Sequence, residues 1–274
     1  MVEKTVAIYV FIDDLFKFSG HKEPESRRVK DAEVVTTALI AGMKFGGNFE
    51  HAMSFVRSTG LMPNMLGKSR FNRRLHQISF LLIEVFLQLS ETVKRLNITS
   101  EYAMDSFPVA VCDNIRIGRS KIVRGEHFRG YKPSKRQFFY GFTVQVIATV
   151  DGIPVEFAIT PAHMHDSEGM RHLSFELPSG SKVYADSAYT DYQHEDDLEQ
   201  ALGISLLSAR KSNSKRKRQP WEEFLINHYR KRIETVFSDV NKLFPRRIHA
   251  VTADGFVLKI ITFILAYMFT KIEY

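Results

Sequence analysis

Apolar residues recur with helical spacing through the first hundred positions of the chain. The spacing predicts helices over Thr5–Phe18, Asp31–Met43 and Phe49–Ser58, with Asn48 as the cap of the third. A longer helix is predicted from about Lys68 to Leu96, with a basic beginning and an apolar body. This part of the chain is therefore expected to be all-helical.

From Glu101 onward the apolar period shortens to that of β-strands. Strands are predicted at Tyr102–Met104, Phe107–Cys112, Phe138–Val150, Ile153–Ile159, Lys182–Ala185 and Ile204–Leu207. Asp151–Gly152 separates two of them and predicts a hairpin with a two-residue turn. Helices are predicted over Asp191–Leu202 and Asn227–Phe244. The pattern thus predicts an α/β fold, with a mixed sheet flanked by helices and preceded by an all-helical region.

The last apolar run, 256–270, is interrupted by Lys259 and falls short of the ~20 residues that span a bilayer. It is interpreted as a core helix that begins near Asp254, and no membrane association and no secretory leader are expected. The only cysteine, Cys112, excludes an internal disulfide and a cysteine-based zinc site. A net charge of +7 favours a polyanionic partner, although charge alone does not separate DNA from RNA or an anionic membrane surface.

Three acids stand in distinct settings. Asp105 and Asp186 each follow a short apolar run, and Glu234 lies inside a basic, amphipathic helix. Acids at strand ends project into a cleft, and together with an acid from a packed helix they can form an all-oxygen site for Mg²⁺. The alternatives are ordinary: an aspartate at a strand end often caps a turn, and a helical glutamate usually faces solvent.

Cations gather in three places, and each has an alternative explanation as a solvated surface. The first is the basic beginning of the long helix, where a helix-turn-helix-like reader of DNA ends and a plain helical scaffold both remain open. The second is 116–136, in which aromatic residues interleave as they do at nucleic-acid surfaces. The third is 211–218. The candidate DNA-binding residues are Arg70, Arg73, Arg74, Arg124, Arg129, Lys132, Lys135, Lys215, Arg216, Lys217, Arg218 and Arg230.

Several segments carry a family resemblance over nearly the whole chain. They are Ser69-Arg-Phe-Asn-Arg-Arg-Leu75, Asp105-Ser-Phe-Pro-Val, Gly130-Tyr-Lys-Pro-Ser-Lys, Phe139-Tyr-Gly-Phe, Ala185-Asp-Ser-Ala-Tyr and Arg230-x-x-x-Glu234. In this order they resemble bacterial insertion-sequence transposases of the DDE type, most closely the insertion-sequence family numbered 982. The resemblance implies a ribonuclease H-like catalytic domain over 99–274 and a helical region over 1–98 that binds DNA ends.

The resemblance also implies a chemistry. Asp105 and Asp186 would hold two Mg²⁺ ions, for which Mn²⁺ can substitute, and Glu234 would complete the coordination of one. His165 and Asp166 belong to a loop that lines the active site in related transposases, and a helix cap is the alternative for Asp166. This chain has Asn227 where relatives carry a tyrosine, and Lys242 is one position beyond the usual lysine.

The expected activity is metal-dependent cleavage at transposon ends and strand transfer into target DNA. The expected partners are the terminal inverted repeats and target DNA, and the active complex is expected to be a homodimer or larger. The protein is expected in the bacterial cytoplasm, on the nucleoid when bound to DNA. Two alternatives stay open: a structure-specific DNA nuclease, and a catalytically silent DNA-binding relative.

Overall fold

The computed structural model describes residues 1–132, 136–245 and 247–272, with only the backbone of ten of them (114, 115, 117, 230, 232, 233, 235–237 and 241). The chain forms two compact units: residues 1–88 with 240–274 (unit 1), and residues 89–239 (unit 2). These units divide the chain differently from the boundary expected near residue 98, because the C-terminal segment joins the N-terminal helices.

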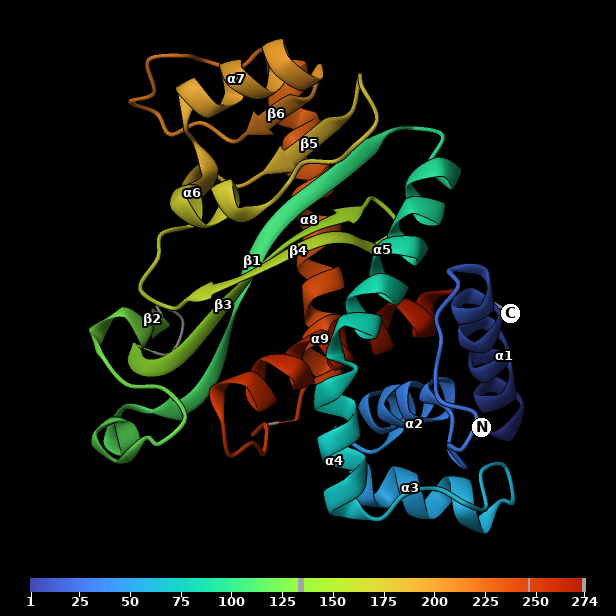
Figure 1. Ribbon diagram of the computed structural model, residues 1–274. Coiled ribbons are helices and arrows are strands. Elements are labelled where there is room, and N and C mark those ends of the chain that lie inside the picture. Colours follow the sequence, from blue (N-terminus) through green and yellow to red (C-terminus); the bar gives the residue numbers. More distant parts are fainter. Residues whose placement is uncertain (133–135, 246, 273–274) are drawn as a thin grey trace. The chain divides into compact units, whose positions relative to one another are not determined.

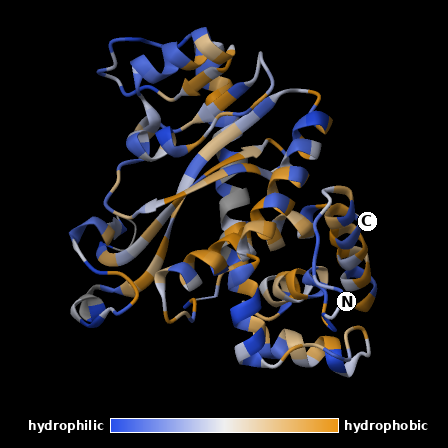
Figure 2. Ribbon diagram, in the orientation of Figure 1, coloured by the Kyte–Doolittle hydropathy of each residue, from blue (hydrophilic) through white to orange (hydrophobic). Residues whose placement is uncertain are grey.

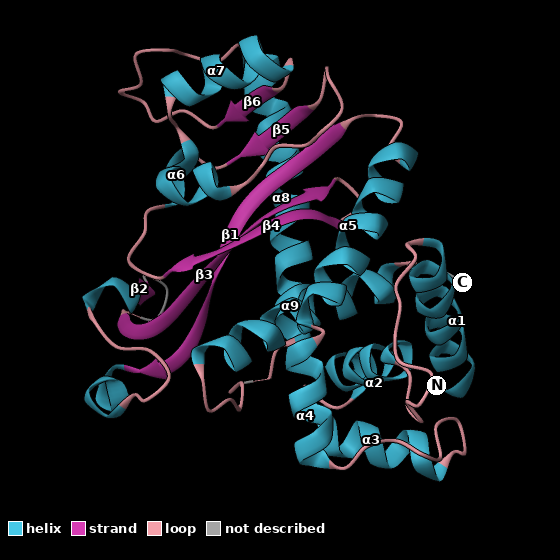
Figure 3. Cartoon of the chain, in the orientation of Figure 1, coloured by secondary structure: helices cyan, strands magenta, loops and turns pink. Residues whose placement is uncertain are grey.

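Unit 1 is helical (Figures 1 and 3). Its helices are α1 (Val2–Phe18), α2 (Asp31–Lys44), α3 (Phe49–Ser58), α4 (Lys68–Gln77), the first part of α5 (Ser79–Leu96), the last residues of α8 (Pro220–Leu243) and α9 (Ala253–Lys271). The Asn48 side chain accepts hydrogen bonds from Glu50 N and His51 N, which confirms the predicted cap of α3. The single helix expected from Lys68 to Leu96 was wrong, because the chain breaks at Ile78, where the backbone turns to φ −105° and ψ 19°.

Helix α9 packs against α2 in the core of unit 1. A Cβ atom on Gly42 would lie 2.9 Å from Ala266 Cβ, so two small residues are needed for this close approach. Apolar residues run along α9 (Figure 2), and within the described chain it is the one helix long and apolar enough to cross a membrane. Since 61% of its most apolar stretch is buried, the helix has the character of the core helix predicted from the sequence.

Unit 2 is built on a six-stranded mixed sheet. Its strands are β1 (Glu101–Asp113), β2 (Arg129–Lys132), β3 (Gln137–Thr149), β4 (Pro154–Pro161), β5 (Lys182–Ala185) and β6 (Ser205–Ser208). The order is β2-β3-β1-β5-β6, with β4 paired to β3. Strands β1 and β3 are antiparallel, whereas β1, β5 and β6 are parallel. Strand β2 was not predicted, since it lies in a segment whose cations indicated a loop.

The β3–β4 hairpin is confirmed, with a longer turn than predicted. Thr149 N donates to Ile153 O at 3.0 Å, which leaves three residues in the loop instead of two. Gly152 ends that loop at φ 89°, a conformation that costs glycine little.

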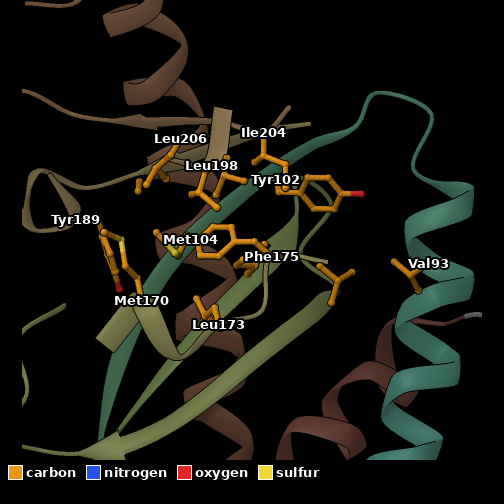
Figure 4. Close-up of a cluster of buried hydrophobic side chains, with 14 residues drawn as sticks. Val93, Tyr102, Met104, Met170, Leu173, Phe175, Tyr189, Leu198, Ile204 and Leu206 are labelled. Atoms are coloured by element: carbon orange, nitrogen blue, oxygen red, sulfur yellow. The ribbon is translucent and has the colours of Figure 1, made fainter. Parts of the chain in front are cut away.

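Each face of the sheet carries its own core. On one face Tyr102 and Met104 pack with residues of the 3₁₀ turns η4 (Met170–His172) and η5 (Ser187–Tyr189) and of α7 (Tyr192–Leu202), as Figure 4 shows. The short helix α6 (Asp166–Gly169) directly precedes η4. On the other face Tyr184 and Leu207 pack against Ile226 of α8 (Pro220–Leu243). Because side chains alternate along a strand, the two sets come from neighbouring residues. The mixed sheet flanked by helices confirms the predicted fold class.

Candidate active site

The two aspartates lie at the same edge of the sheet. Met104 pairs with Ala185 in the parallel register of β1 and β5. Asp105 is the next residue within β1, and Asp186 directly follows the last residue of β5. Both side chains are half-buried. The parallel register therefore brings together two carboxylates that are 81 positions apart in the sequence.

Local hydrogen bonds orient both carboxylates. Asp105 Oδ1 accepts from Ser106 N at 2.8 Å. The Asp186 side chain accepts from Ser187 N and thereby caps the short turn η5. The alternative explanation of Asp186 as a turn cap is therefore confirmed. The same hydrogen bond orients the carboxylate at the end of β5, so capping does not prevent Asp186 from belonging to a site.

A hydrogen-bonded chain of side chains lies directly beside the two acids. Ser106 Oγ donates to Asp166 Oδ1 at 2.7 Å, and Gln145 Nε2 donates to the same oxygen at 3.3 Å. Tyr189 Oη donates to Gln145 Oε1 at 2.6 Å. Asp166 therefore links the neighbour of Asp105, on β1, to the turn that Asp186 caps. It is the first residue of α6, and its side chain does not cap that helix, so this alternative for Asp166 was wrong.

The Tyr189 hydroxyl is buried close to the negative charges at this edge. Burial raises its pKa well above the ordinary value, and the carboxylates of Asp166, Asp105 and Asp186 raise it further. Since like charges disfavour a phenolate, Tyr189 stays a neutral hydrogen-bond donor. Three carboxylates within electrostatic reach of one hydroxyl make this edge attractive to cations.

Helix α8 carries Glu234 and is anchored to the sheet by Tyr229, a residue that no motif in the sequence singled out. Tyr229 stacks on Tyr184 of β5, with ring centroids 4.4 Å apart. Tyr184 donates to Glu101 Oε1 at 3.0 Å, and Tyr229 donates to Glu101 Oε2. One carboxylate at the start of β1 thus receives both hydroxyls, which fixes the helix over the strands that carry the aspartates.

The Glu234 side chain is exposed on α8. Over the described ranges 1–132, 136–245 and 247–272, no three His, Cys, Asp or Glu side chains lie close enough to hold a metal ion. The structure therefore brings Asp105 and Asp186 to one edge and leaves the participation of Glu234 a prediction.

The histidine loop before α6 lies at the surface. His165 is exposed and is the residue before the first turn of α6. His163 Nδ1 lies 2.6 Å from the backbone oxygen of His127. Two residues of this loop, His165 and Asp166, were expected beside the active site. Asp166 is the one that accepts a hydrogen bond from Ser106, the neighbour of Asp105.

The expected DNA-binding residues of 116–136 lie mostly at the surface. Arg124 and Arg129 are exposed, and Lys132 is half-buried with its ammonium 4.7 Å from the centroid of Phe139. Lys135, and the side chain of Arg230 on α8, lie outside the described residues.

The arginines of 211–218 hold acids of α7. Arg216 forms a bidentate pair with Asp196, at 2.6 and 2.9 Å. Arg218 Nη2 donates to Leu206 O at 2.9 Å and lies 3.3 Å from Glu195, and its side chain is 14% exposed. Lys215 and Lys217 are exposed. The expectation that all four cations of 215–218 present themselves at the surface therefore fails for Arg218.

The arginines of α4 in unit 1 also differ in their exposure and in their partners. Arg70 and Arg73 are exposed. Arg74 Nε instead donates to Asp31 at 2.6 Å, and His21 and Arg27 hold the other oxygen of that buried carboxylate at 3.0 and 3.2 Å. Arg74 thus stabilises the core of unit 1, contrary to the expected surface role.

Comparison with known proteins gives one match. A family model described as "Transposase DDE domain" matches residues 98–269, more than half of the chain. No curated protein and no solved structure gives a significant match.

Proposed function

The chain belongs to the family of transposase DDE domains, and we propose that it cleaves the phosphodiester bonds at transposon ends and transfers the cut strands into target DNA. Within that family we assign it to the insertion sequences numbered 982. It would act in the bacterial cytoplasm as a homodimer or larger, since two ends must be cut and joined together.

The observation that carries the proposal is the paired position of Asp105 and Asp186 at one edge of the sheet. Their oxygen-only chemistry, beside the charge of Asp166, fits hard divalent cations such as Mg²⁺ or Mn²⁺. When bound, two such ions would supply an activated water or 3′-hydroxyl and stabilise the leaving 3′-oxygen. The aspartates would ligate the ions, and no covalent enzyme intermediate is needed.

Glu234 is the proposed third ligand. Its support is the resemblance together with the anchoring of α8 by Tyr229. Glu234 lies five positions after Tyr229 on α8, a rise of about 7.5 Å along the axis. The anchored helix would thereby hold the glutamate near the strands that carry the aspartates.

DNA binding is proposed for two sets of exposed cations. Arg70 and Arg73 on α4 would contact terminal repeats, and the exposed cations of 116–136 would contact DNA on unit 2. Arg230 and Lys135 remain predicted contacts on the strength of the sequence.

Incubation with DNA ends of its own element tests the proposal. Cleavage should appear with Mg²⁺ or Mn²⁺ and disappear in EDTA. Ca²⁺ should support DNA binding without cleavage, because its loose coordination misplaces the nucleophile. Full cleavage in EDTA would contradict a metal-dependent mechanism.

A strand-transfer assay with paired ends separates the transposase from its two alternatives. A structure-specific nuclease would cut without joining, and a silent relative would bind without cutting. Joined products that depend on Mg²⁺ are the outcome expected here.

A further inference from the structure

An exposed cluster of one cation and two aromatic rings covers part of the β2–β3 hairpin, with the two ring planes tilted by 51°. The Arg129 guanidinium carbon lies 4.5 Å from the Phe138 ring centroid, and the Phe138 and Tyr131 centroids are 4.9 Å apart. Tyr131 is 48% exposed and Phe138 is 40% exposed. We call Arg129, Tyr131 and Phe138 the stacking platform.

The platform is held by sheet hydrogen bonding. Tyr131 of β2 stands directly opposite Phe138 of β3 in the antiparallel register. Cross-strand neighbours of this kind keep their side chains in contact without help from a loop. The two rings are exposed side by side on neighbouring strands, so they offer a joint apolar surface that a ligand can cover.

The surroundings of the platform are cationic. Glu126 is the only acid in the sequence 116–136, and it lies 3.3 Å from Arg129 in an exposed pair that contributes little. The exposed cations of the described part of this segment are Arg116, Arg119, Lys121, Arg124, Arg129 and Arg136. Flat rings beside cations are the surface that binds single-stranded nucleic acid: bases stack on the rings and phosphates contact the cations.

The platform shares a strand with the acid edge. Asp105 pairs with Val146 of β3, and Phe138 lies eight residues earlier on that strand, roughly 26 Å away at the usual rise. An even separation puts Phe138 and Val146 on the same face of the sheet. One DNA strand of about eight nucleotides, at about 3.4 Å each, would connect the two places.

We propose that the stacking platform binds unpaired bases of a DNA single strand that leads away from Asp105 and Asp186. This inference rests on the proposed function, since it takes DNA as the substrate, and adds that the DNA is melted at this end of the sheet. Paired bases stack on one another in a duplex and offer the platform no free face, so the preference is for single strands.

The test compares binding of the full chain, in EDTA, to a labelled 20-nucleotide thymidine strand and to a hairpin duplex. Replacing both rings (Tyr131→Ala with Phe138→Ala) should weaken single-strand binding about ten-fold or more, with less than about two-fold change for the duplex. The variant Tyr131→Phe with Phe138→Trp keeps two flat rings and should bind as the wild type does. Phe18→Ala, which removes an 89% exposed ring in unit 1, is the matched control and should change neither affinity.

An abasic strand of equal length sharpens the result. It keeps the phosphates and removes the bases, so the wild type should bind it as weakly as the double alanine variant binds thymidine. Equal losses on single strand and duplex, or no loss on either, would overturn the platform while leaving DNA as the substrate. A wild-type protein that binds neither DNA would overturn the proposed function as well. Thermal unfolding of each variant checks that the fold is kept.

Discussion

Two basic segments that look alike in the sequence have different structural roles. In 116–136 the arginines lie at the surface beside exposed aromatic rings. In 211–218, Arg218 is 14% exposed and, together with Arg210 directly before the segment (4% exposed), holds Glu195 of α7. The number of arginines in a segment therefore does not predict a ligand. What decides is whether a carboxylate from a neighbouring element reaches the guanidinium. The comparison assigns DNA affinity to the first segment and a stabilising role to the two arginines that hold Glu195.

The largest effect is expected from replacing a proposed metal ligand, which changes neither of the two basic segments. Asp186→Asn should lower cleavage and joining by about three orders of magnitude, because a bound metal ion contributes several kcal/mol of transition-state stabilisation. Binding of end DNA should stay unchanged or tighten slightly, since the basic segments are intact and one negative charge is gone. Gel-shift and cleavage assays on one preparation measure both. Near-normal cleavage would remove Asp186 from the active site.

The stability role of the second segment predicts a large effect of Glu195→Ala. Arg210 and Arg218 would then be left buried without their shared carboxylate, which should cost about 3–5 kcal/mol of unfolding free energy. Asp196→Ala is the matched control one residue away. Its pair with Arg216 is 41–51% exposed, so the loss should stay below about 1 kcal/mol. Urea denaturation measures both, and equal losses would erase the distinction between the segments.

The acids also differ in whether they hold neighbouring side chains. Asp166 accepts hydrogen bonds from two of them, which predicts a positioning role. Asp166→Ala should raise the Mn²⁺ concentration needed for half-maximal cleavage by about 10–100-fold, because Ser106 and Gln145 lose their common acceptor. Asp166→Asn keeps an oxygen acceptor and should restore most of the metal affinity. An unchanged metal requirement in the alanine variant would leave Asp166 a purely structural residue.

The smallest expected effect lies within the second segment itself. Replacing the exposed Lys215 and Lys217 with alanine should flatten the slope of log K against log salt by ~0.9 for each lost phosphate contact. Arg218→Ala should leave that slope unchanged and instead lower the unfolding free energy, since its guanidinium holds Glu195 and Leu206 O. Fluorescence titrations at several salt concentrations give the slopes. A slope changed by Arg218→Ala alone would reverse the assignment.

Features that depend on neighbouring residues were predictable from the sequence. Asn48 caps α3 because its side chain reaches amides two and three residues away, and β5 follows its apolar run. The start of α8 was predicted seven residues late, at Asn227, although the sequence contains the signal. Pro220 fits a first helical position, and Glu222 accepts from Gln219 N at 2.7 Å.

The sequence by itself determined the α/β class, the position of Asp186 at the end of a strand and the excess of cations, because these follow from local pattern and composition. The expectation that Asp105 also ends a strand was wrong, because β1 continues without a break to Asp113. Only the tertiary structure decided which charges are bound internally. Arg74 meets Asp31 across 43 positions, Lys94 meets Glu156 across 62, and Ser106 meets Asp166 across 60. Such partners are chosen by the packing of elements far apart in the chain, and an isolated charged residue looks the same in the sequence whether its partner is a buried carboxylate or a phosphate.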